Sequence, residues 1–175
     1  MAWSGSAIFT QTMNNPLLQA TAGSGTSLPT GWVTTGIANN GFKAALYLTT
    51  TPLNTDTMAH IGYNGAGGPW VTANEASGTN YTAGGTALGT LSYGIDGTAT
   101  NALAFHAANA SWTTVTVSAV FGDLVYCTSI TAGTVANQGF CFNYFGGSQS
   151  VTAGTFTIAW FTTGYSSGTV FSITT

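Results

Sequence analysis

Apolar and polar residues alternate in short segments over most of this chain. The clearest case is FKAALYLT at residues 42–49, which ends before Pro52. A period of two residues is the pattern of a β-strand, because successive side chains point to opposite faces of a sheet. Further strands are predicted on the same grounds at residues 86–95, 102–107, 115–128, 138–145, 155–163 and 169–174. The pattern therefore predicts an all-β chain.

The segment 115–128 changes character along its length. Val115, Val117 and Ala119 alternate with Thr and Ser, as expected for a strand with one buried face. Beyond Phe121 the residues on both faces become apolar. We therefore expect this end of the strand to be covered on both sides.

Glycine and short polar residues separate the predicted strands. The chain has 24 glycines, and turn signals recur about every eight to twelve residues, which is typical of a sandwich or barrel. The predicted fold is an antiparallel β-sandwich, jelly-roll-like, with an N-terminal arm or short helix. The arm is assigned to residues 1–40 and the sandwich domain to residues 41–175.

Two segments are predicted to lie largely outside the sheets. Residues 7–20 carry an approximate helical stripe that Asn14-Asn15-Pro16 interrupts, so they form either a partial helix or an extended arm. Residues 53–85 are rich in Gly and Asn, which predicts long loops with one short strand near Trp70. Loops of this length commonly bind a partner or are ordered by a neighbouring subunit.

The chain is almost free of charge. Lys43 is its only basic residue, against the four acids Asp56, Glu75, Asp96 and Asp123, and the net charge is −3. Nucleic acid and anionic membranes are therefore not expected as partners, because both are bound mainly through Lys and Arg. A surface with so little charge favours association, which indicates an assembled structural protein. Lys43 is a candidate to pair with one of the four acids or with a carboxylate of an adjoining subunit.

Catalytic chemistry is not indicated by the sequence. The four acids are dispersed, and most lie in turn contexts. Asp123 is the exception: it lies in an apolar strand, so it needs a hydrogen-bonding partner if it is buried. A β-bulge after Gly122 is one place where it could sit. His60 or His106 could join a serine in a hydrolase triad, but no Gly-x-Ser-x-Gly segment is present, and structural histidines are favoured. We expect no enzyme activity, no cofactor and no metal site.

Cys127 and Cys141 lie in two β-like segments, nearly symmetric about the turn-rich stretch 131–137. A cross-strand disulfide is conceivable, although two buried thiols are favoured because the cytoplasm is reducing. Synthesis in a cytoplasm is expected, since the N-terminus shows no basic n-region followed by an apolar run.

The aromatic residues exceed what a modest core easily hides. There are five Trp, seven Tyr and ten Phe, and aromatic residues are enriched where subunits meet. An aromatic platform for carbohydrate is a further alternative. The candidate interface residues are Trp3, Phe9, Trp32, Trp70 and Tyr81.

Several short motifs recur in an order typical of one family. They are the strand at residues 41–48, the segment 74–85 with Glu75, Gly78-x-x-Tyr81 and Gly84-Gly85, the segment 110–113, and the segment 154–160 near the C-terminus. Together they cover about residues 41–175, and they resemble small virion structural proteins of tailed bacteriophages. The group usually carries many acidic residues in the loops and before this tryptophan; the chain departs from it, with few acids in all and Asn109 and alanines before Trp112. In the motif itself, Gly78 permits a tight turn, Tyr81 can bury its ring while its hydroxyl bonds, and Gly84-Gly85 lets the backbone reverse.

The resemblance implies a non-enzymatic virion protein made in the bacterial host cytoplasm. It would be a minor capsid or decoration protein that binds the shell through its arm and its loops. Its partners would be copies of itself, with a trimer as one arrangement, and major capsid or tail proteins. A tail-tube or minor tail protein is the alternative within this class. A receptor-binding or carbohydrate-binding tip module, stacking ligands on exposed residues such as Trp70, is the alternative outside it.

Overall fold

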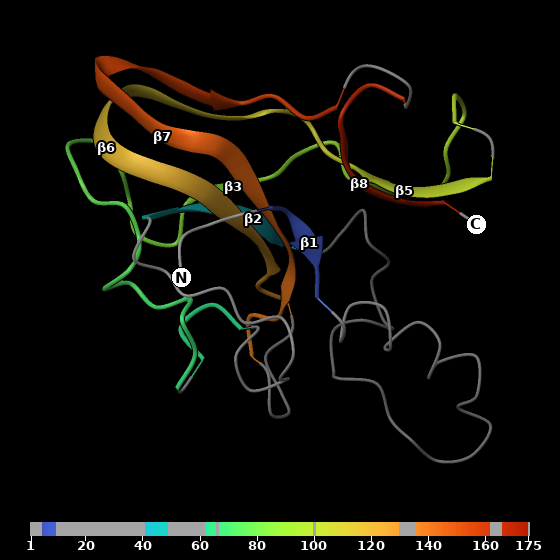
Figure 1. Cartoon of the computed structure of the whole chain (residues 1–175), viewed down its shortest axis with the longest axis horizontal. Coiled ribbons are helices and arrows are strands. Elements are labelled where there is room, and N and C mark those ends of the chain that lie inside the picture. The colour runs from blue at the N-terminus through green and yellow to red at the C-terminus, as the bar shows by residue number, and fades with distance from the viewer. Residues whose placement is uncertain are drawn as a thin grey trace.

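The computed structural model describes residues 5–9, 41–48, 62–65, 67–99, 101–129, 136–161 and 166–174. Within these ranges the chain forms eight β-strands and no helix (Figure 1). The strands are β1 (Ala7–Ile8), β2 (Phe42–Leu48), β3 (Thr86–Ala87), β4 (Ser92–Ile95), β5 (Ala102–His106), β6 (Ala110–Cys127), β7 (Gly139–Ile158) and β8 (Thr169–Thr174). In these residues no helix is long and apolar enough to cross a membrane.

The strands form two antiparallel sheets. The larger sheet has the order β1-β7-β6-β2-β3, and the smaller has the order β4-β5-β8. Figure 1 shows β6 and β7 curling together at one end of the molecule, with β5 and β8 at the other end. The all-β, antiparallel, sandwich-like prediction is confirmed; jelly-roll connectivity stays a prediction.

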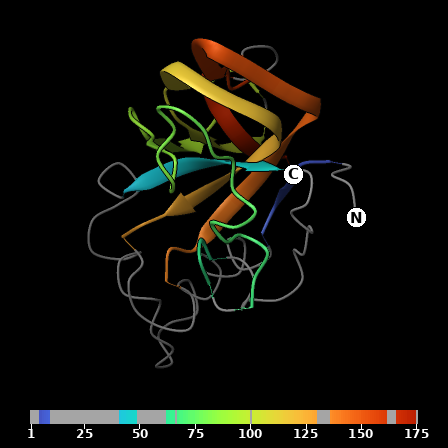
Figure 2. The same cartoon turned by 90° about the vertical axis from the view of Figure 1, so that its left-hand side faces the viewer.

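The long strand β6 bends through several bulges, and Figure 2 shows β6 and β7 passing over β2. Thr114 and Ala119 have positive φ angles of 54° and 55°, at places where the pairing with β7 shifts register. The bulge at Ala119 changes which residues point inward: Val115 and Val117 are buried, Ala119 is exposed, and Val120 takes the next buried position. The expectation that Ala119 continues the buried face is therefore wrong.

The covered end of β6 agrees with the sequence prediction. Every residue of the segment 122–127 is buried. Val125 and Cys127 belong to one hydrophobic cluster, whereas Leu124 and Tyr126 belong to a second. The strand therefore separates two cores, as its two apolar faces predicted.

β7 is longer than the sequence pattern indicated. The segments 138–145 and 155–163 were expected as two strands, but Gly139–Ile158 is continuous and pairs with β6 over most of its length. The intervening GGSQSVTAG looks like a loop because it is polar and contains glycine. It forms strand because it pairs with the N-terminal half of β6, whose exposed positions are mostly Ser and Thr.

The segment 86–95 forms two strands in place of the single strand expected. β3 pairs with β2 in the larger sheet, whereas β4 pairs with β5 in the smaller sheet. Between them Leu88 is buried and its N–H bonds to the Phe42 carbonyl, and Thr90 then adopts a φ of 52°. The chain crosses from one sheet to the other at this point.

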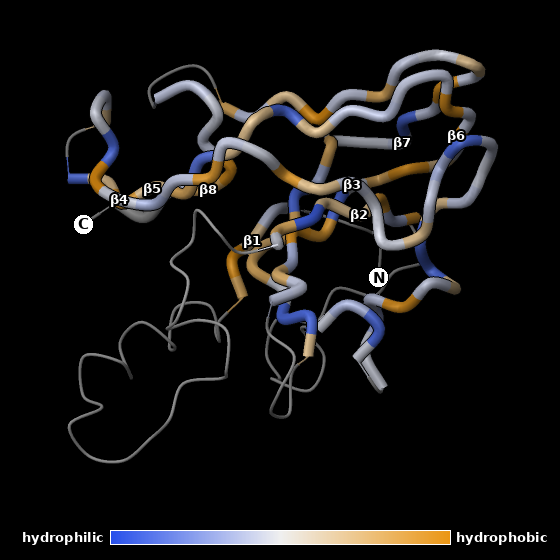
Figure 3. Tube along the Cα trace, turned by 180° about the vertical axis from the view of Figure 1, so that it is seen from behind, coloured by the Kyte–Doolittle hydropathy of each residue, from blue (hydrophilic) through white to orange (hydrophobic). Residues whose placement is uncertain are grey.

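The main core lies between the two sheets. Phe42 from the larger sheet packs on Phe105 from the smaller one with ring centroids 5.0 Å apart, and Phe140 and Phe171 extend the same contact. Figure 3 shows hydrophobic residues as short stretches between paler and polar ones, so the core is built from alternation and not from long apolar blocks.

The second core lies on the other face of the larger sheet. Trp70, from the loop before β3, packs on Tyr47, Phe9 and Phe142, with the Tyr47 and Trp70 ring centroids 5.0 Å apart. The loop segment around Trp70 therefore covers this face. Residues 7–8, the start of the segment predicted to be a partial helix or an extended arm, pair with β7 as an extended strand. Residues 10–20 of that segment lie outside the described residues.

Candidate functional site

The acidic motif residue Glu75 lies in a buried hydrogen-bond network. Its side chain is 3% exposed, and its backbone bridges to Tyr47 of β2. Oε1 accepts hydrogen bonds from the Tyr81 hydroxyl and the Gly84 N–H, both at 2.7 Å. Oε2 accepts the Tyr63 hydroxyl at 2.9 Å. The carboxylate thus joins three points of the loop region.

The same network ties the loop to the sheet. The Tyr81 hydroxyl also accepts the Leu46 N–H of β2 at 2.9 Å. Tyr126 of β6 donates its hydroxyl to the Gly84 carbonyl at 2.8 Å, and the Tyr63 ring stacks on the Tyr126 ring with centroids 4.6 Å apart. We call Glu75, Tyr63, Tyr81, Tyr126 and Gly84 the Glu75 network.

The motif glycines are required by close backbone contacts. A Cβ at Gly78 would overlap the carbonyl oxygen of Thr116, and a Cβ at Gly85 would overlap that of Ala44. Gly84 and Gly85 also have positive φ angles of 89° and 71°, which residues with a side chain rarely adopt. The motif therefore positions backbone, as its residue types indicated.

Burial keeps the tyrosines of this region protonated. Desolvation, followed by the nearby Glu75 charge, raises the pKa of Tyr47, Tyr81 and Tyr126 far above the ordinary value. Burial and the hydrogen bond to Glu75 raise the pKa of Tyr63 in the same direction. The Tyr63 and Tyr81 hydroxyls donate to the Glu75 carboxylate and hold it in place, while the Tyr126 hydroxyl donates to the Gly84 carbonyl.

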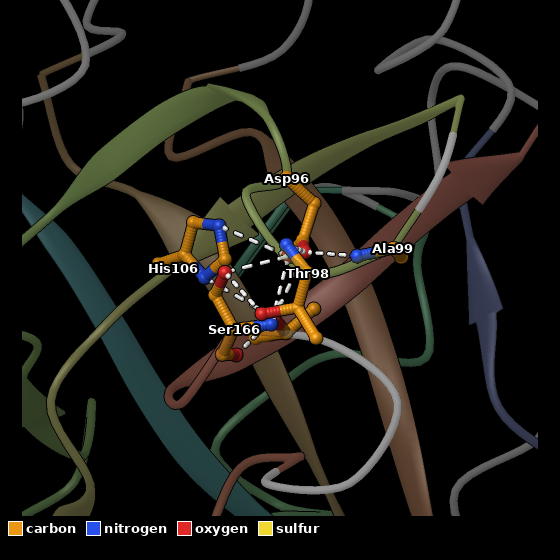
Figure 4. A network of polar contacts seen from close by, with 6 residues as sticks. Asp96, Thr98, Ala99, His106 and Ser166 are labelled. Atoms are coloured by element: carbon orange, nitrogen blue, oxygen red, sulfur yellow. Dashed lines mark hydrogen bonds and ion pairs between the residues drawn. The ribbon is translucent and has the colours of Figure 1, made fainter.

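A second polar cluster joins the β4–β5 turn to the segment before β8 (Figure 4). Asp96 Oδ1 accepts the Thr98 and Ala99 N–H groups, both at 2.7 Å, and Oδ2 accepts the Ser166 N–H at 3.0 Å. These backbone bonds, that of Ala99 foremost, lower the pKa of Asp96 to about 2. The carboxylate closes the turn and anchors a segment 70 residues away.

His106 has a structural position in this cluster. Its Nδ1 lies 3.1 Å from the Thr169 hydroxyl, and its Nε2 lies 3.6 Å from Asp96 Oδ2. A hydrolase triad needs the serine hydroxyl on the imidazole, but the Ser166 hydroxyl bonds to Asp96 Oδ1 at 3.2 Å. The arrangement does not activate Ser166 as a nucleophile.

Asp123 is buried in the ladder of β6. It is 0% exposed and pairs in register with Leu46 of β2 and Asn143 of β7. The bulge expected after Gly122 is therefore wrong, because the register shift lies before Gly122. Asn143 Nδ2 lies 3.4 Å from Oδ2, and Oδ1 has no hydrogen-bond partner among the described residues. Burial raises the pKa of Asp123 to about 8.

Both cysteines are buried free thiols. Cys141 lies opposite Val125, so Cys127 is offset from it along β6. Burial, followed by the proximity of Asp123, raises the pKa of the Cys141 thiol. The structure holds the unbonded form that the sequence favoured.

The candidate interface residues fall into three groups. Trp3 and Trp32 lie outside the described residues, as do Asp56 and His60. Phe9 and Trp70 are each 0% exposed, so a partner cannot contact them and Trp70 cannot serve as a stacking platform. Tyr81 is partly buried and its hydroxyl belongs to the Glu75 network.

Lys43 has no acidic partner in the described part of the chain. There, the one ion-pair contact is that of His106 with Asp96. Lys43 lies instead opposite Tyr126 and Ala87 in the sheet. Its pairing with a carboxylate of an adjoining subunit stays a prediction.

Sequence reasoning missed the large apolar residues that are exposed. They are Tyr93 at 41%, Ile95 at 83%, Leu103 at 39% and Phe161 at 60%. Ile95 and Leu103 are direct partners across β4 and β5, which places their side chains next to each other on one face. Alternation marked both segments as strands, but it could not show that the core ends before this pair.

The described residues contain no group of three His, Cys, Asp or Glu side chains that could hold a metal ion. Comparison with known proteins gives no match: no family model, no curated protein and no solved structure is similar to the chain.

Proposed function

We propose that this chain is a non-enzymatic structural protein of a tailed-phage virion, and specifically a minor capsid or decoration protein. The observation that carries the proposal is the Glu75 network. The motif on which the resemblance to such proteins rests uses its carboxylate, its tyrosine and its glycines to hold the loop on the sheet. A motif used in this way supports an architectural role.

The exposed apolar pair Ile95 and Leu103 supports assembly. It lies at the end of the smaller sheet in a chain with one basic residue and four acids. Contacts made by such residues bury apolar surface without removing charged groups from water. They also vary little with salt, because screening acts on charges.

The contact surface differs from the one first expected. Phe9 and Trp70 stabilise the core, so they leave the set of proposed contacts. Ile95, Leu103 and Phe161 take their place. Removal of residues 1–28 would also remove β1 and Phe9, so truncation is a poor test of binding by the arm alone.

A direct test is co-sedimentation with phage shells that lack the protein. The double variant Ile95→Thr, Leu103→Thr should bind less than the wild type, since it removes most of the apolar contact. Threonine is β-branched and suits a strand, so the sheet should be kept. Thr113→Ala, at an exposed position of β6, is the matched control and should bind normally. Binding should persist from about 0.1 to about 1 M salt. Two results would count against the proposed contact: full binding by the double variant, or loss of binding by the wild type at high salt.

A further inference from the structure

A cleft of about 690 Å³ opens over the smaller sheet. Its lining comes from β4, from the end of β5 and from the segment before β8. The residues used in the argument below are Thr90, Ser92, Tyr93, Gly94, Asn109 and Ser167. Known ligand pockets span about 300–1,000 Å³, so the cleft is large enough for a small organic ligand.

The part of the cleft at Gly94 is open. Gly94 lies on β4, the edge strand of the sheet, and a Cβ added there would meet nothing within 4 Å. Its partner across the sheet is Ala104, which is small and 0% exposed. The missing side chain at Gly94 leaves room for a ligand to approach the strand backbone.

The cleft lining combines polar and apolar groups and presents little net charge. The Asp96 side chain beside the cleft is 0% exposed, and its oxygens accept bonds from Thr98, Ala99 and Ser166. Lys43 lies on β2 and is not part of the lining. Among the described residues that line the cleft, an ionic ligand would therefore find no unpaired lysine or carboxylate to bind.

Neutral hydrogen-bonding groups do line the cleft. In the described part of the chain, the side-chain hydroxyls of Thr90, Ser92 and Ser167 form no hydrogen bond, and all three residues are exposed. Asn109 accepts the Trp160 N–H through Oδ1 at 3.3 Å, which orients its amide and leaves Nδ2 to donate. Tyr93 adds a ring that is 41% exposed.

Part of the cleft wall is held in place before any ligand arrives. The His106 imidazole, 16% exposed, is fixed between Thr169 and Asp96. Thr90 has a φ of 52°, which is strained for a β-branched residue. Strain of this kind concentrates at binding sites, and groups fixed in advance lower the entropic cost of binding.

We infer that this cleft binds a short neutral oligosaccharide. Sugar hydroxyls both donate and accept hydrogen bonds, which matches a lining of hydroxyls and an amide. The apolar C–H face of a sugar ring can pack on an aromatic ring such as that of Tyr93. A purely apolar ligand fits less well, because it would leave the lining hydroxyls desolvated and unpaired. This inference goes beyond the proposed function and does not depend on the location of the protein in a particle.

The test uses the purified full chain and a panel of neutral oligosaccharides of glucose, mannose, galactose and N-acetylglucosamine. Binding is measured by saturation-transfer NMR and by calorimetric titration. The wild type should bind at least one member with a Kd of about 1 mM or tighter. Gly94→Val should weaken that binding at least about tenfold, because the new side chain enters the open space. Gly5→Val is the control, since its Cβ also meets nothing but lies outside the cleft.

Tyr93→Ala and Tyr93→Phe provide a second pair of variants. Loss of affinity in the alanine variant with retention in the phenylalanine variant supports stacking on the ring. Thermal melting of each variant confirms that it folds. The inference is overturned if the wild type shows no saturable binding to any member up to about 10 mM. It is also overturned if Gly94→Val binds as tightly as the wild type. These experiments use the purified protein without virions, so neither binding nor its absence decides the proposed structural function, which has its own test.

Discussion

The Tyr81 hydroxyl donates a hydrogen bond to Oε1 of Glu75 at 2.7 Å, and Glu75 is only 3% exposed. The same hydroxyl accepts the Leu46 N–H, so a single phenol joins the loop carboxylate to β2. This relationship explains why an acidic residue, a tyrosine and several glycines occur together in the segment 74–85. They form a clamp that fixes a long loop on the sheet.

Substitution of Glu75 should destabilise the fold. Glu75→Ala leaves the Gly84 N–H and the Tyr63 and Tyr81 hydroxyls without their acceptor, so we expect a loss of about 3 kcal/mol in the free energy of unfolding. Tyr81→Phe should lose about 1–2 kcal/mol. Urea unfolding measures both, and the double variant should lose less than the sum because the residues are in contact. Strict additivity would contradict the network.

Two glycines of the motif should not tolerate a methyl group. Gly78→Ala and Gly85→Ala place a Cβ against a backbone carbonyl that has no freedom to move, and we expect each to lose at least about 2 kcal/mol. Gly89→Ala is the matched control, because its Cβ meets nothing within 4 Å. Thermal melting distinguishes them. Equal melting temperatures for all three variants would show that the close approach of the backbone is not required.

Asp123 should make the fold less stable as pH rises. Its pKa is about 8 in the fold against an ordinary 3.8, so the folded state keeps a proton that the unfolded state releases. The stabilising contribution of the protonated group is complete below pH 3.8 and is lost as pH rises toward 8, at about 1.4 kcal/mol per pH unit.

Asp123→Asn removes this titration while keeping an acceptor for Asn143. We expect the variant to be more stable than the wild type at pH 8 and to approach it near pH 4. Cys141, which lies close to Asp123, is kept reduced in both proteins. Parallel stability curves for the two proteins across this range would show that Asp123 is already ionised in the fold.

Asp96 should act in the opposite direction and at lower pH. Its pKa is lowered from 3.8 to about 2, so the carboxylate stabilises the fold above pH 3.8, and this contribution is lost as pH falls through about 2. Asp96→Asn should therefore be less stable than the wild type near neutral pH, with the difference vanishing at the acid end. Backbone amide NMR signals of Thr98, Ala99 and Ser166 report the change locally. Unchanged signals in the variant would contradict these bonds.

Much of the strand pattern could be predicted from the sequence, because alternation reports directly on which face is buried. It placed β2, β5 and β8 closely, and it indicated the two-sided burial of residues 122–127. It failed where the backbone departs from a regular strand. The bulge at Ala119 moves burial to Val120, and the crossing near Thr90 divides one apparent strand between two sheets.

The site was harder to predict, since its contacts join residues far apart in sequence. The motif pointed to Glu75 and Tyr81, but nothing in it identified Tyr63 or Tyr126 as further members. Asp96 and Ser166 are 70 residues apart, and neither stands in a recognisable motif with the other. Aromatic content alone also could not separate the buried Trp70 from the exposed Tyr93.

The most direct test of the proposed structural role is to locate the protein in particles. Virions produced by the genome that encodes this chain would be purified, labelled with an antibody to it, and imaged by electron microscopy, with cryo-electron microscopy for symmetry. We expect label in repeated copies on the capsid, with Ile95 and Leu103 at a contact with a neighbouring subunit. Label on the tail alone would favour the tail alternative. Absence of the protein from purified particles would contradict the proposal.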